Sequence, residues 1–194
     1  MGKKTNVILV VAKSGAGKDY VVNKILDSNS DMVKDNSRIS KVISRTTRKP
    51  RYEGEDTHLF IDAVTAHREI FKSIAWTKFS GNYYYAMPED LINHGIYIID
   101  PNGVKEFKNN SEYNKFDTIV FSITCPWYLR LVRMIKRDGL FKAIKRIITD
   151  IKDFKDIDKY VDISAKTGKE AQKVFSKLVK EFLFMEKKSN EIYF

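Results

Sequence analysis

The chain has 194 residues, of which 43% are hydrophobic, and a formal net charge of +10 at pH 7. This length suits one compact unit with small inserted subdomains. The longest purely apolar run, VILVVA at 7–12, is far below the ~18 residues of a membrane span. Together with the lack of a signal-peptide core, this favours a cytoplasmic protein that does not bind membranes.

The positive charge is spread along the chain instead of forming one nucleic-acid-binding patch. Many lysines alternate with acidic residues, as in DIKDFKDIDK at 150–159, a pattern typical of a solvated helix face. The arginines gather in two stretches, 45–51 and 130–146. Because the guanidinium fork matches phosphate, we expect two sides of one phosphate-binding site. Nucleic acid is not an expected partner, and the oligomeric state is left open.

Cysteine usage excludes two ways of stabilising the fold. Cys125 is the single cysteine, so an internal disulfide cannot form, and no Cys/His cluster has zinc spacing. Packing of apolar side chains must therefore stabilise the fold without a disulfide or a structural zinc ion.

Apolar runs alternate with amphipathic segments along most of the chain. The predicted strands are 6–11, 41–44, 58–61, 75–79, 82–86, 96–100, 118–124 and 159–163. The predicted helices are 17–27, 63–72, 88–93, 102–109, 126–136, 140–154 and 169–186. Strands followed by helices predict an α/β fold with a doubly wound parallel sheet.

Two regions break this alternation. Between 56 and 86 strands outnumber helices, and SGNYYY at 80–85 is typical of an antiparallel turn, so a small sheet-rich insertion is predicted. The tail 187–194 is predicted to fray, or to dock through Ile192, Tyr193 and Phe194.

The first strand runs into the loop AKSGAGKD at 12–19, and an amphipathic helix follows. Strand, small-residue loop, lysine and helix come in the order of a P-loop, whose backbone N–H groups surround phosphate oxygens. Lys18 is expected to reach the transferred phosphates. The alternative is a tight strand-to-helix turn with an exposed lysine. The expected ATP-binding residues are Ser14, Gly15, Ala16, Gly17, Lys18 and Asp19.

Two positions of this loop depart from the usual pattern. Ala12 replaces the first glycine, which an ordinary backbone conformation tolerates. Asp19 replaces the hydroxyl residue that normally binds Mg²⁺. A carboxylate is also a hard oxygen ligand, so Asp19 is the candidate metal ligand, directly or through water.

Three later segments resemble the guanylate kinase family. They are SRTTRKPRYEGEDTHLF at 44–60, FSGNYYYAMP at 79–88 and YIIDPNGV at 97–104, and they follow the P-loop in the family's order. The resemblance extends to about Arg146. It implies a P-loop nucleoside monophosphate kinase fold, with a parallel core, a small mixed or antiparallel acceptor-binding subdomain and a helical lid.

The resemblance also implies an activity and a division of the chain. The activity is Mg²⁺-dependent phosphoryl transfer from ATP to a nucleoside monophosphate, GMP or dGMP first. The implied segments are a core at 1–37, 87–130 and 151–194, an acceptor subdomain at 38–86 and a lid at 131–150.

The acceptor-binding residues follow from this resemblance. His58 stands where the family has a phosphate-binding tyrosine, and it keeps one hydrogen-bond donor. Asp100 is expected near the acceptor and the metal-bound phosphates. The alternatives are surface salt bridges for Arg48 and Arg51, and simple packing for the neighbouring tyrosines. The full set is Ser44, Arg48, Arg51, His58, Tyr84 and Asp100.

Base recognition departs from the family. Ala75 and Ala86 occupy the positions of the glutamate and of the serine or threonine that read guanine. Methyl groups cannot make the hydrogen bonds that reject a wrong base, so another nucleoside monophosphate is an open alternative. Thr77, Lys78 and Glu89 are candidates for compensation.

The second arginine stretch lies in LRLVRMIKRDGLFKAIKRI at 129–147. Arg133 and Arg137 fall four apart on one helix face, with Arg130 a turn back. The resemblance implies that the catalytic cations are Lys18, Arg48, Arg133, Arg137 and Arg146, which neutralise charge on the moving phosphoryl group, while closure excludes water. The alternative is an amphipathic helix with solvated cations.

Two other function classes compete. DPNG at 100–103, NKFD at 114–117 and SAK at 164–166 resemble small-GTPase motifs, but NKFD precedes its strand, whereas nucleotides bind at the carboxyl ends. SAKTG is instead a candidate for the adenine pocket. The second alternative is a catalytically inactive guanylate-kinase-like module that binds phosphopeptides. The presence of Lys18 and the lid arginines opposes it.

Overall fold

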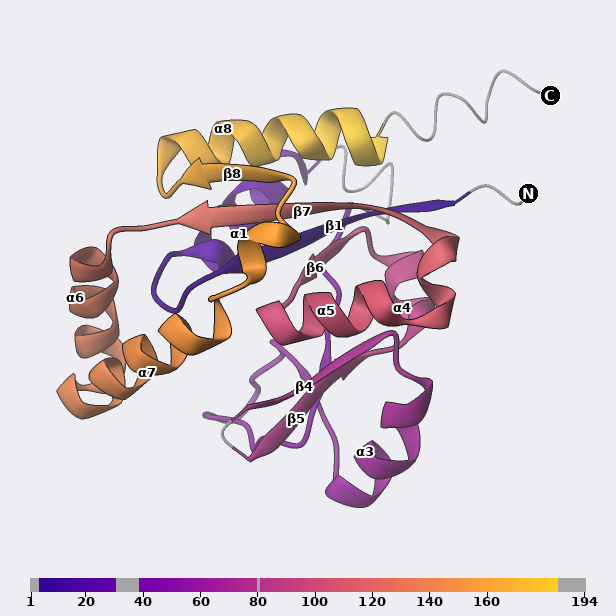
Figure 1. Cartoon of the computed structure of the whole chain (residues 1–194), viewed down its shortest axis with the longest axis horizontal. Helices are drawn as coiled ribbons and strands as arrows, with labels where there is room; N and C mark the ends of the chain where they lie inside the picture. The colour runs from indigo at the N-terminus through magenta and orange to yellow at the C-terminus, as the bar shows by residue number, and fades with distance from the viewer. Residues whose placement is uncertain (1–3, 31–38, 80, 185–194) are drawn as a thin grey trace.

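The structure is a computed structural model that describes residues 4–30, 39–79 and 81–184. The described helices and strands appear in Figure 1. The strands are β1 (Thr5–Ala12), β2 (Arg45–Thr46), β3 (Leu59–Phe60), β4 (Ala75–Phe79), β5 (Asn82–Ala86), β6 (Ile96–Ile98), β7 (Phe116–Thr124) and β8 (Ile163–Lys166). The α-helices are α1 (Lys18–Ser28), α3 (Ala63–Glu69), α4 (Pro88–Asn93), α5 (Pro101–Asn109), α6 (Trp127–Asp138), α7 (Leu140–Asp153) and α8 (Lys169–Leu178).

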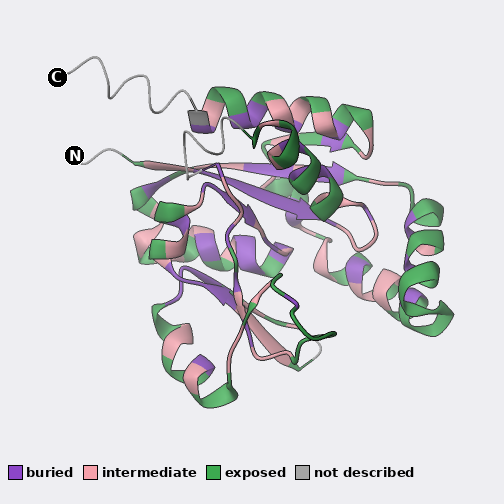
Figure 2. Ribbon diagram, turned by 180° about the vertical axis from the view of Figure 1, so that it is seen from behind, coloured by how far each residue is buried: buried purple, intermediate pink, exposed green. Residues whose placement is uncertain are grey.

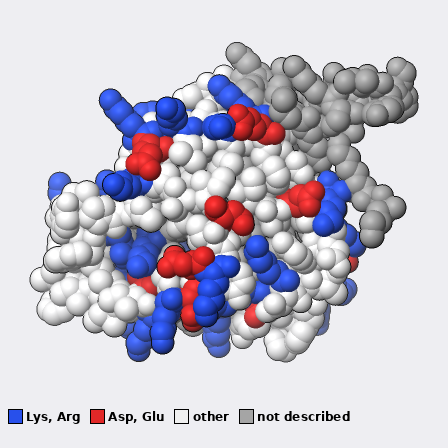
Figure 3. Space-filling view, turned by 45° about the horizontal axis from the view of Figure 1, so that its top comes forward, with Lys and Arg blue, Asp and Glu red and all other residues white. Residues whose placement is uncertain are grey.

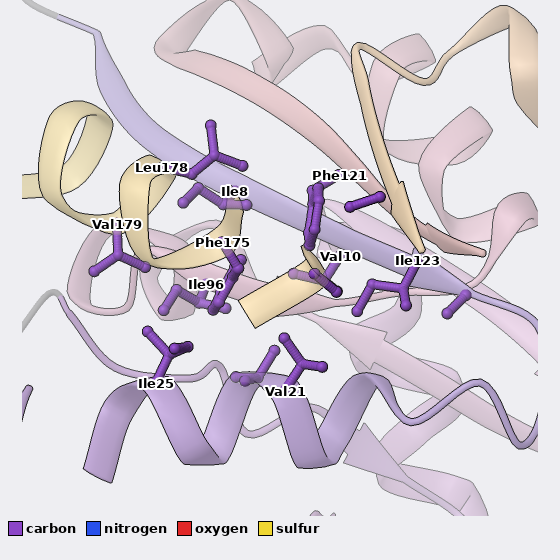
Figure 4. Packing of buried hydrophobic residues seen from close by; sticks show 14 of the residues in the cluster. Ile8, Val10, Val21, Ile25, Ile96, Phe121, Ile123, Phe175, Leu178 and Val179 are labelled. Carbon is purple, nitrogen blue, oxygen red and sulfur yellow. The ribbon is translucent and has the colours of Figure 1, made fainter. Parts of the chain in front are cut away.

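The main sheet has the strand order β6-β1-β7-β8, and all its pairs are parallel. Side chains of β1 alternate between two hydrophobic clusters because successive residues of a strand point to opposite faces. Ile8 and Val10 pack with Val21 of α1 and Phe175 of α8 (Figure 4). Val7, Leu9 and Val11 join the cluster that contains α5. Helices therefore cover both faces, which confirms the predicted doubly wound α/β fold.

A second sheet, of order β3-β2-β5-β4, lies below the main one in Figure 1. β4 and β5 pair antiparallel and β2 pairs antiparallel with β5, while β2 and β3 are parallel. Tyr85, Ala66 of α3 and Met87 form a small core of their own on this sheet. The predicted small mixed sheet with an antiparallel turn is confirmed, and its strands are only partly buried (Figure 2).

Two predicted strands differ from the structure. Residues 41–44 form no strand, and Lys41 makes only an isolated parallel bridge to Ile96. The last strand is Ile163–Lys166 and not 159–163, because Ile157–Lys159 forms a short 3₁₀ turn and the Asp162 carboxylate accepts the Val120 amide at 2.7 Å.

At the C-terminal end, α8 stops at Leu178 and continues as a π-helix over Val179–Phe184. The rest of the predicted helix and the docking residues Ile192, Tyr193 and Phe194 lie outside the described residues. None of the helices within 4–30, 39–79 and 81–184 is long and apolar enough to cross a bilayer. Cys125 is a free thiol, as predicted.

Candidate active site

The loop between β1 and α1 lies at the carboxyl end of β1, where parallel sheets place their ligands. Gly15 has φ +76°, and a Cβ there would lie 2.9 Å from the carbonyl oxygen of Arg130. Gly17, with φ +90°, is the N-cap of α1. Only glycine combines this backbone with this close approach. The loop is therefore shaped by its small residues, and Lys18 opens the helix.

Ser14 takes a different role from the one predicted. Its amide donates to Asp150 Oδ2 at 2.9 Å and its hydroxyl to Asp150 Oδ1 at 3.0 Å. Arg130 Nε donates to the Ser14 carbonyl at 2.8 Å, and Arg146 Nε donates to the Ser14 hydroxyl at 2.6 Å. The Ser14 amide is thus engaged by α7, which leaves the amides nearer α1 as the candidate phosphate ligands.

Arg130 lies on the same side of α6 as Arg133, as its spacing predicted, because both side chains bond to the phosphate loop. Its side chain is nevertheless 5% exposed and forms an ion pair with Asp150, whose side chain is 6% exposed. The pair links α6 to α7 directly beneath the phosphate loop. Sequence reasoning missed Asp150, because a helix-period pattern does not distinguish a buried acid from the exposed acids around it.

Asp150→Asn is expected to destabilise the protein by about 3–5 kcal/mol, because it leaves the Arg130 charge buried without its counter-ion. Urea unfolding at neutral pH measures this change. The matched control is Asp158→Asn, since Asp158 is exposed and its replacement should leave the unfolding free energy within about 0.5 kcal/mol. Equal stability of the two variants would contradict the role given to the buried pair.

A pocket of about 200 Å³ lies between the phosphate loop and α6. It is lined by Gly15, Gly17, Lys18, Asp19, Arg133, Met134 and Arg137. Arg133 Nη1 donates to the Gly15 carbonyl at 3.1 Å, which holds its guanidinium over the loop. Arg137 pairs with Asp138. The structure thus brings Lys18 together with two of the predicted catalytic arginines.

The charge of Asp19 suits a metal ligand, because its side chain is held as a carboxylate. Burial on its own raises the pKa of Asp19, but the charge and hydrogen bond of Lys18, assisted by Lys41, lower the pKa below its usual value. Lys18 Nζ lies 3.3 Å from the carboxylate. Among the described residues no cluster of three acidic, His or Cys side chains could hold a metal. Mg²⁺ needs no such cluster, since one carboxylate and substrate phosphates commonly hold it.

Arg146 connects α7 to the small sheet. Its guanidinium lies 3.7 Å from the centroid of the Phe79 ring at the end of β4. Burial lowers the pKa of Arg146, as does the charge of Arg137, while Asp150 and Tyr84 oppose the shift. The third predicted catalytic arginine therefore lies where the phosphate loop, α7 and the small sheet meet.

Residues 47–58, between β2 and β3, form the acceptor loop. This loop is organised around Glu55, which sequence reasoning missed. Arg48 donates to both Glu55 oxygens, at 3.1 and 2.8 Å. Glu55 also accepts from the Arg51 amide and the Thr57 hydroxyl, both at 2.7 Å. Arg48 Nε is buried without a hydrogen-bond partner among the residues that the structure describes. The Arg51 side chain, by contrast, is 70% exposed. The sequence contained one sign of this role, because Glu55 is an acidic residue four positions after Arg51 in an otherwise basic loop.

Glu55→Gln is expected to weaken acceptor binding more than turnover. Losing a charge-assisted hydrogen bond costs about 1.5–3 kcal/mol, which corresponds to a roughly ten- to hundredfold rise in acceptor KM. Steady-state kinetics with varied acceptor tests this, and a fall in kcat at constant KM would contradict it.

Glu55→Gln is also expected to change how the free energy of unfolding depends on pH. Hydrogen bonds from Arg48, the Arg51 amide and Thr57 hold the pKa of Glu55 well below its usual 4.5. Its stabilisation is therefore complete above the unfolded pKa and is lost as the pH falls toward the lower folded pKa. Urea unfolding should show a steeper loss of stability below about pH 4.5 for the wild type than for Glu55→Gln. Parallel curves would contradict it.

The other acceptor candidates surround this loop. Ser44 Oγ lies 2.9 Å from His58 Nδ1, and the His58 and Tyr84 rings meet edge to face at 5.6 Å. Burial, followed by the nearby Arg48 charge, lowers the pKa of His58, so this ring is neutral at pH 7. Four of the six predicted residues, counting Arg48, are thus brought together at the small sheet.

Asp100 lies at the end of β6 and caps α5. Its carboxylate accepts the Gly103 amide at 2.8 Å. Burial raises the pKa of Asp100, although hydrogen bonds from Gly103 and Thr77 oppose the shift. Asp100 therefore caps α5 and lies beside Thr77 of β4, and its predicted place near the acceptor stays a prediction.

Ala75 and Ala86 lie directly opposite each other in the β4–β5 ladder, and they are 1% and 0% exposed. Both belong to the core cluster beneath the small sheet. Neither offers a polar atom beyond the backbone. Thr77, two residues along, shares their face of the sheet, so it is the nearest side-chain hydroxyl on that strand.

The SAKTG segment lies beside the phosphate loop. Thr167 follows β8, and its hydroxyl donates to the Ala16 carbonyl at 2.8 Å while its amide donates to the Thr124 carbonyl at 2.8 Å. Thr167 thus ties the end of β8 to the loop between β1 and α1. The sequence located this segment but did not single out Thr167.

Comparisons with known proteins were made on the sequence and on the structure. No family model matches the chain. A guanylate kinase of Bdellovibrio bacteriovorus is 35% identical over 153 residues, which cover 72% of this chain and 76% of that protein. A guanylate kinase of Cupriavidus pinatubonensis is 37% identical over 83 residues, and the chain spans only 35% of its length.

The structure also resembles a solved protein. It matches the crystal structure of guanylate kinase from Anaplasma phagocytophilum with a TM-score of 0.58, covering 96% of this chain and 88% of that one at 20% identity. At this identity the match concerns the fold, whereas the Bdellovibrio relative matches in sequence over most of both chains. On these grounds, with a glycine-shaped phosphate loop facing paired arginines, the chain belongs to the guanylate kinase family.

Proposed function

We propose that this protein transfers the terminal phosphoryl group of ATP to a nucleoside monophosphate, with GMP or dGMP as the first acceptor. The observation that carries the proposal is the pocket in which Lys18 and Asp19 face Arg133 and Arg137. Both curated relatives described above are named guanylate kinase. The proposed segments are a core at 1–37, 87–130 and 151–194, an acceptor subdomain at 38–86 and a lid at 131–150.

The chemistry asks for charge neutralisation and positioning more than for covalent help. Lys18 and the backbone amides of Gly17 and Lys18 bind the donor phosphates. Arg133, Arg137 and Arg146 neutralise charge on the moving group. No general base is required, because the attacking phosphate oxygen is already anionic near neutral pH.

Asp19 is the residue that would hold Mg²⁺. The ion, when bound, neutralises phosphate charge and orients the transferred group. The Asp19 carboxylate is ionised at neutral pH, because its pKa lies below the usual value, and it lies beside Lys18 at the opening of α1. These properties fit a hard divalent cation.

The acceptor phosphate is proposed to bind at Ser44, Arg48, Arg51, His58 and Tyr84. Arg48 is held in place by Glu55, with its Nε inside the loop. His58, neutral through burial, serves as a single hydrogen-bond donor or acceptor. Asp100 belongs to the same side of the site through its position beside Thr77 of β4.

A second acceptor is favoured by one observation. The two positions at which the family reads guanine carry Ala75 and Ala86, whose methyl groups are buried in the core. Another ribo- or deoxyribonucleoside monophosphate is therefore the second proposed acceptor. The protein is proposed to work in the cytoplasm, where these nucleotides occur.

ADP release from ATP and Mg²⁺, measured against a full panel of ribo- and deoxyribonucleoside monophosphates, tests the proposal. Turnover in the range of roughly 1–100 s⁻¹ with at least one acceptor is expected. No ADP release with any acceptor would contradict the proposed kinase activity and favour a module that binds phosphorylated ligands without reaction.

A further inference from the structure

The helical hairpin formed by α6 and α7 carries an unpartnered apolar surface. Eighteen large hydrophobic residues are exposed within the described chain, and ten of them lie on these two helices. Figure 2 shows both helices largely exposed, and the lobe at the left of Figure 3, where Figure 1 places them, is mostly uncharged. A monomer rarely leaves so much contiguous apolar surface in water.

This surface faces away from the active site. Arg130, Arg133 and Arg146 bond to Ser14 and Gly15, so their sides of α6 and α7 face the phosphate loop. Eight of the ten exposed apolar residues lie on the other sides of the two helices, whereas Trp127 and Leu129 share the helix face of Arg130 and Arg133. A partner seated there would leave the nucleotide pocket open.

The spacing on α7 is that of a helix-pairing seam. Phe141, Ile144, Ile148 and Ile151 are 88%, 45%, 54% and 63% exposed, and they follow each other at intervals of three, four and three residues. This is the spacing of the apolar positions of a coiled coil. The order of intervals reads the same in both directions. An antiparallel copy of α7 therefore sets Phe141 against Ile151 and Ile144 against Ile148.

The available area is sufficient for a dimer. An aromatic side chain presents roughly 150–250 Å², so the eight large apolar residues that face away from the site, at about half exposure, present on the order of 600–1,000 Å². Each partner in a standard interface buries about 800 Å². The self-complementary seam fits a two-fold axis, along which the same patch meets itself.

From this geometry we infer that the α6–α7 hairpin is a docking surface for a second copy of this chain, which packs as a two-fold bundle of four helices. Lys142, Lys145 and Lys152 border the seam on α7, where their long stems extend over apolar surface and keep the charge in water. The lysines of the two copies repel each other, and salt screens this repulsion. The dimer is therefore tighter at high ionic strength.

Sedimentation equilibrium of the full chain tests the inference, at about 5–100 μM protein and about 0.1 and 0.5 M NaCl. The expected mass is twice 22.6 kDa, with the tighter association in high salt. Phe141→Asp and Ile148→Asp should each weaken association at least about a hundredfold. Circular dichroism and thermal melting check that the variants fold. Since these side chains are exposed, at least one variant remains folded.

The matched control is Phe71→Asp, because Phe71 is 80% exposed but lies in the 3₁₀ turn after α3. It should dimerise like the wild type. A monomeric wild type at the highest concentration overturns the inference. Unchanged dimerisation of both Phe141→Asp and Ile148→Asp also overturns it, as does loss of the dimer in Phe71→Asp. Binding of a monomeric chain to phosphatidylserine vesicles that is lost in Phe141→Asp assigns the surface to lipid and overturns it equally.

Discussion

Lys18→Ala is expected to lower kcat by at least about a hundredfold, because it removes a fixed positive charge from the place where negative charge moves during transfer. Lys18 lies at the first turn of α1, in the pocket with Arg133 and Arg137. The fold should be unaffected, since the side chain packs against no core cluster of the described residues. ADP release at saturating ATP and acceptor measures the effect.

Lys24→Ala is the matched control for this variant. Lys24 lies on the same helix, and its amine contacts the hydroxyl and ring of the exposed Tyr20. Its replacement should leave kcat within about twofold. Wild-type turnover in Lys18→Ala, or an equal loss in both variants, would mean that the phosphate loop has been placed wrongly.

The second large effect is expected in base selection. A site that hydrogen-bonds its substrate rejects an analogue by roughly 10⁴–10⁵, whereas a methyl-lined site discriminates by only about 10–200-fold. With Ala75 and Ala86 at the reading positions, kcat/KM for GMP should exceed that for the next monophosphate by no more than about 200-fold. Competition between paired acceptors in one reaction measures the ratio directly.

Ala86→Ser sharpens this test. It restores a hydroxyl at one reading position with the smallest change of volume, and the neighbouring backbone stays paired through the Ile74 amide to the residue 86 carbonyl at 2.9 Å. The GMP preference should rise several-fold, by the roughly 1 kcal/mol of one added hydrogen bond. A wild-type ratio of 10⁴ or more, unchanged in the variant, would show that other groups read the base.

Elements with strong local signals were predictable from the sequence. The strands Ala75–Phe79 and Asn82–Ala86 and the helix Pro88–Asn93 have the predicted bounds. The turn chemistry of Gly81, at φ +81°, and the proline at the start of α4 fix these bounds locally. The phosphate loop was predictable for a related reason, because glycines at fixed spacing leave few other conformations.

Features that depend on tertiary contacts were not predictable. The bounds of the last strand were wrong because Asp162 bonds across to β7, a contact that no local pattern encodes. Glu55 and Asp150 belong to the same class. Asp150 binds Ser14, which is 136 residues away in the sequence. The partners of Glu55 all lie within seven residues, but a sequence without coordinates gives an acid beside an arginine the same weight as any exposed pair.

The proposed reaction requires the phosphate loop and the acceptor loop to face one another across α6 and α7. Arg137, followed by the nearby charge of Arg51, lowers the pKa of Asp138, and Arg146 bonds to Ser14 while it stacks on Phe79. Charges from both loops therefore meet at this hairpin.

A crystal structure with adenosine and guanosine joined by five phosphates tests this arrangement most directly. The expected phosphate chain runs from the amides of Gly17 and Lys18, past Arg133 and Arg137, to Arg48. An analogue bound elsewhere, such as the 380 Å³ pocket beside Trp76 on the outer face of the small sheet, would contradict the account, as would one whose phosphates leave Lys18 or Arg48 without contact.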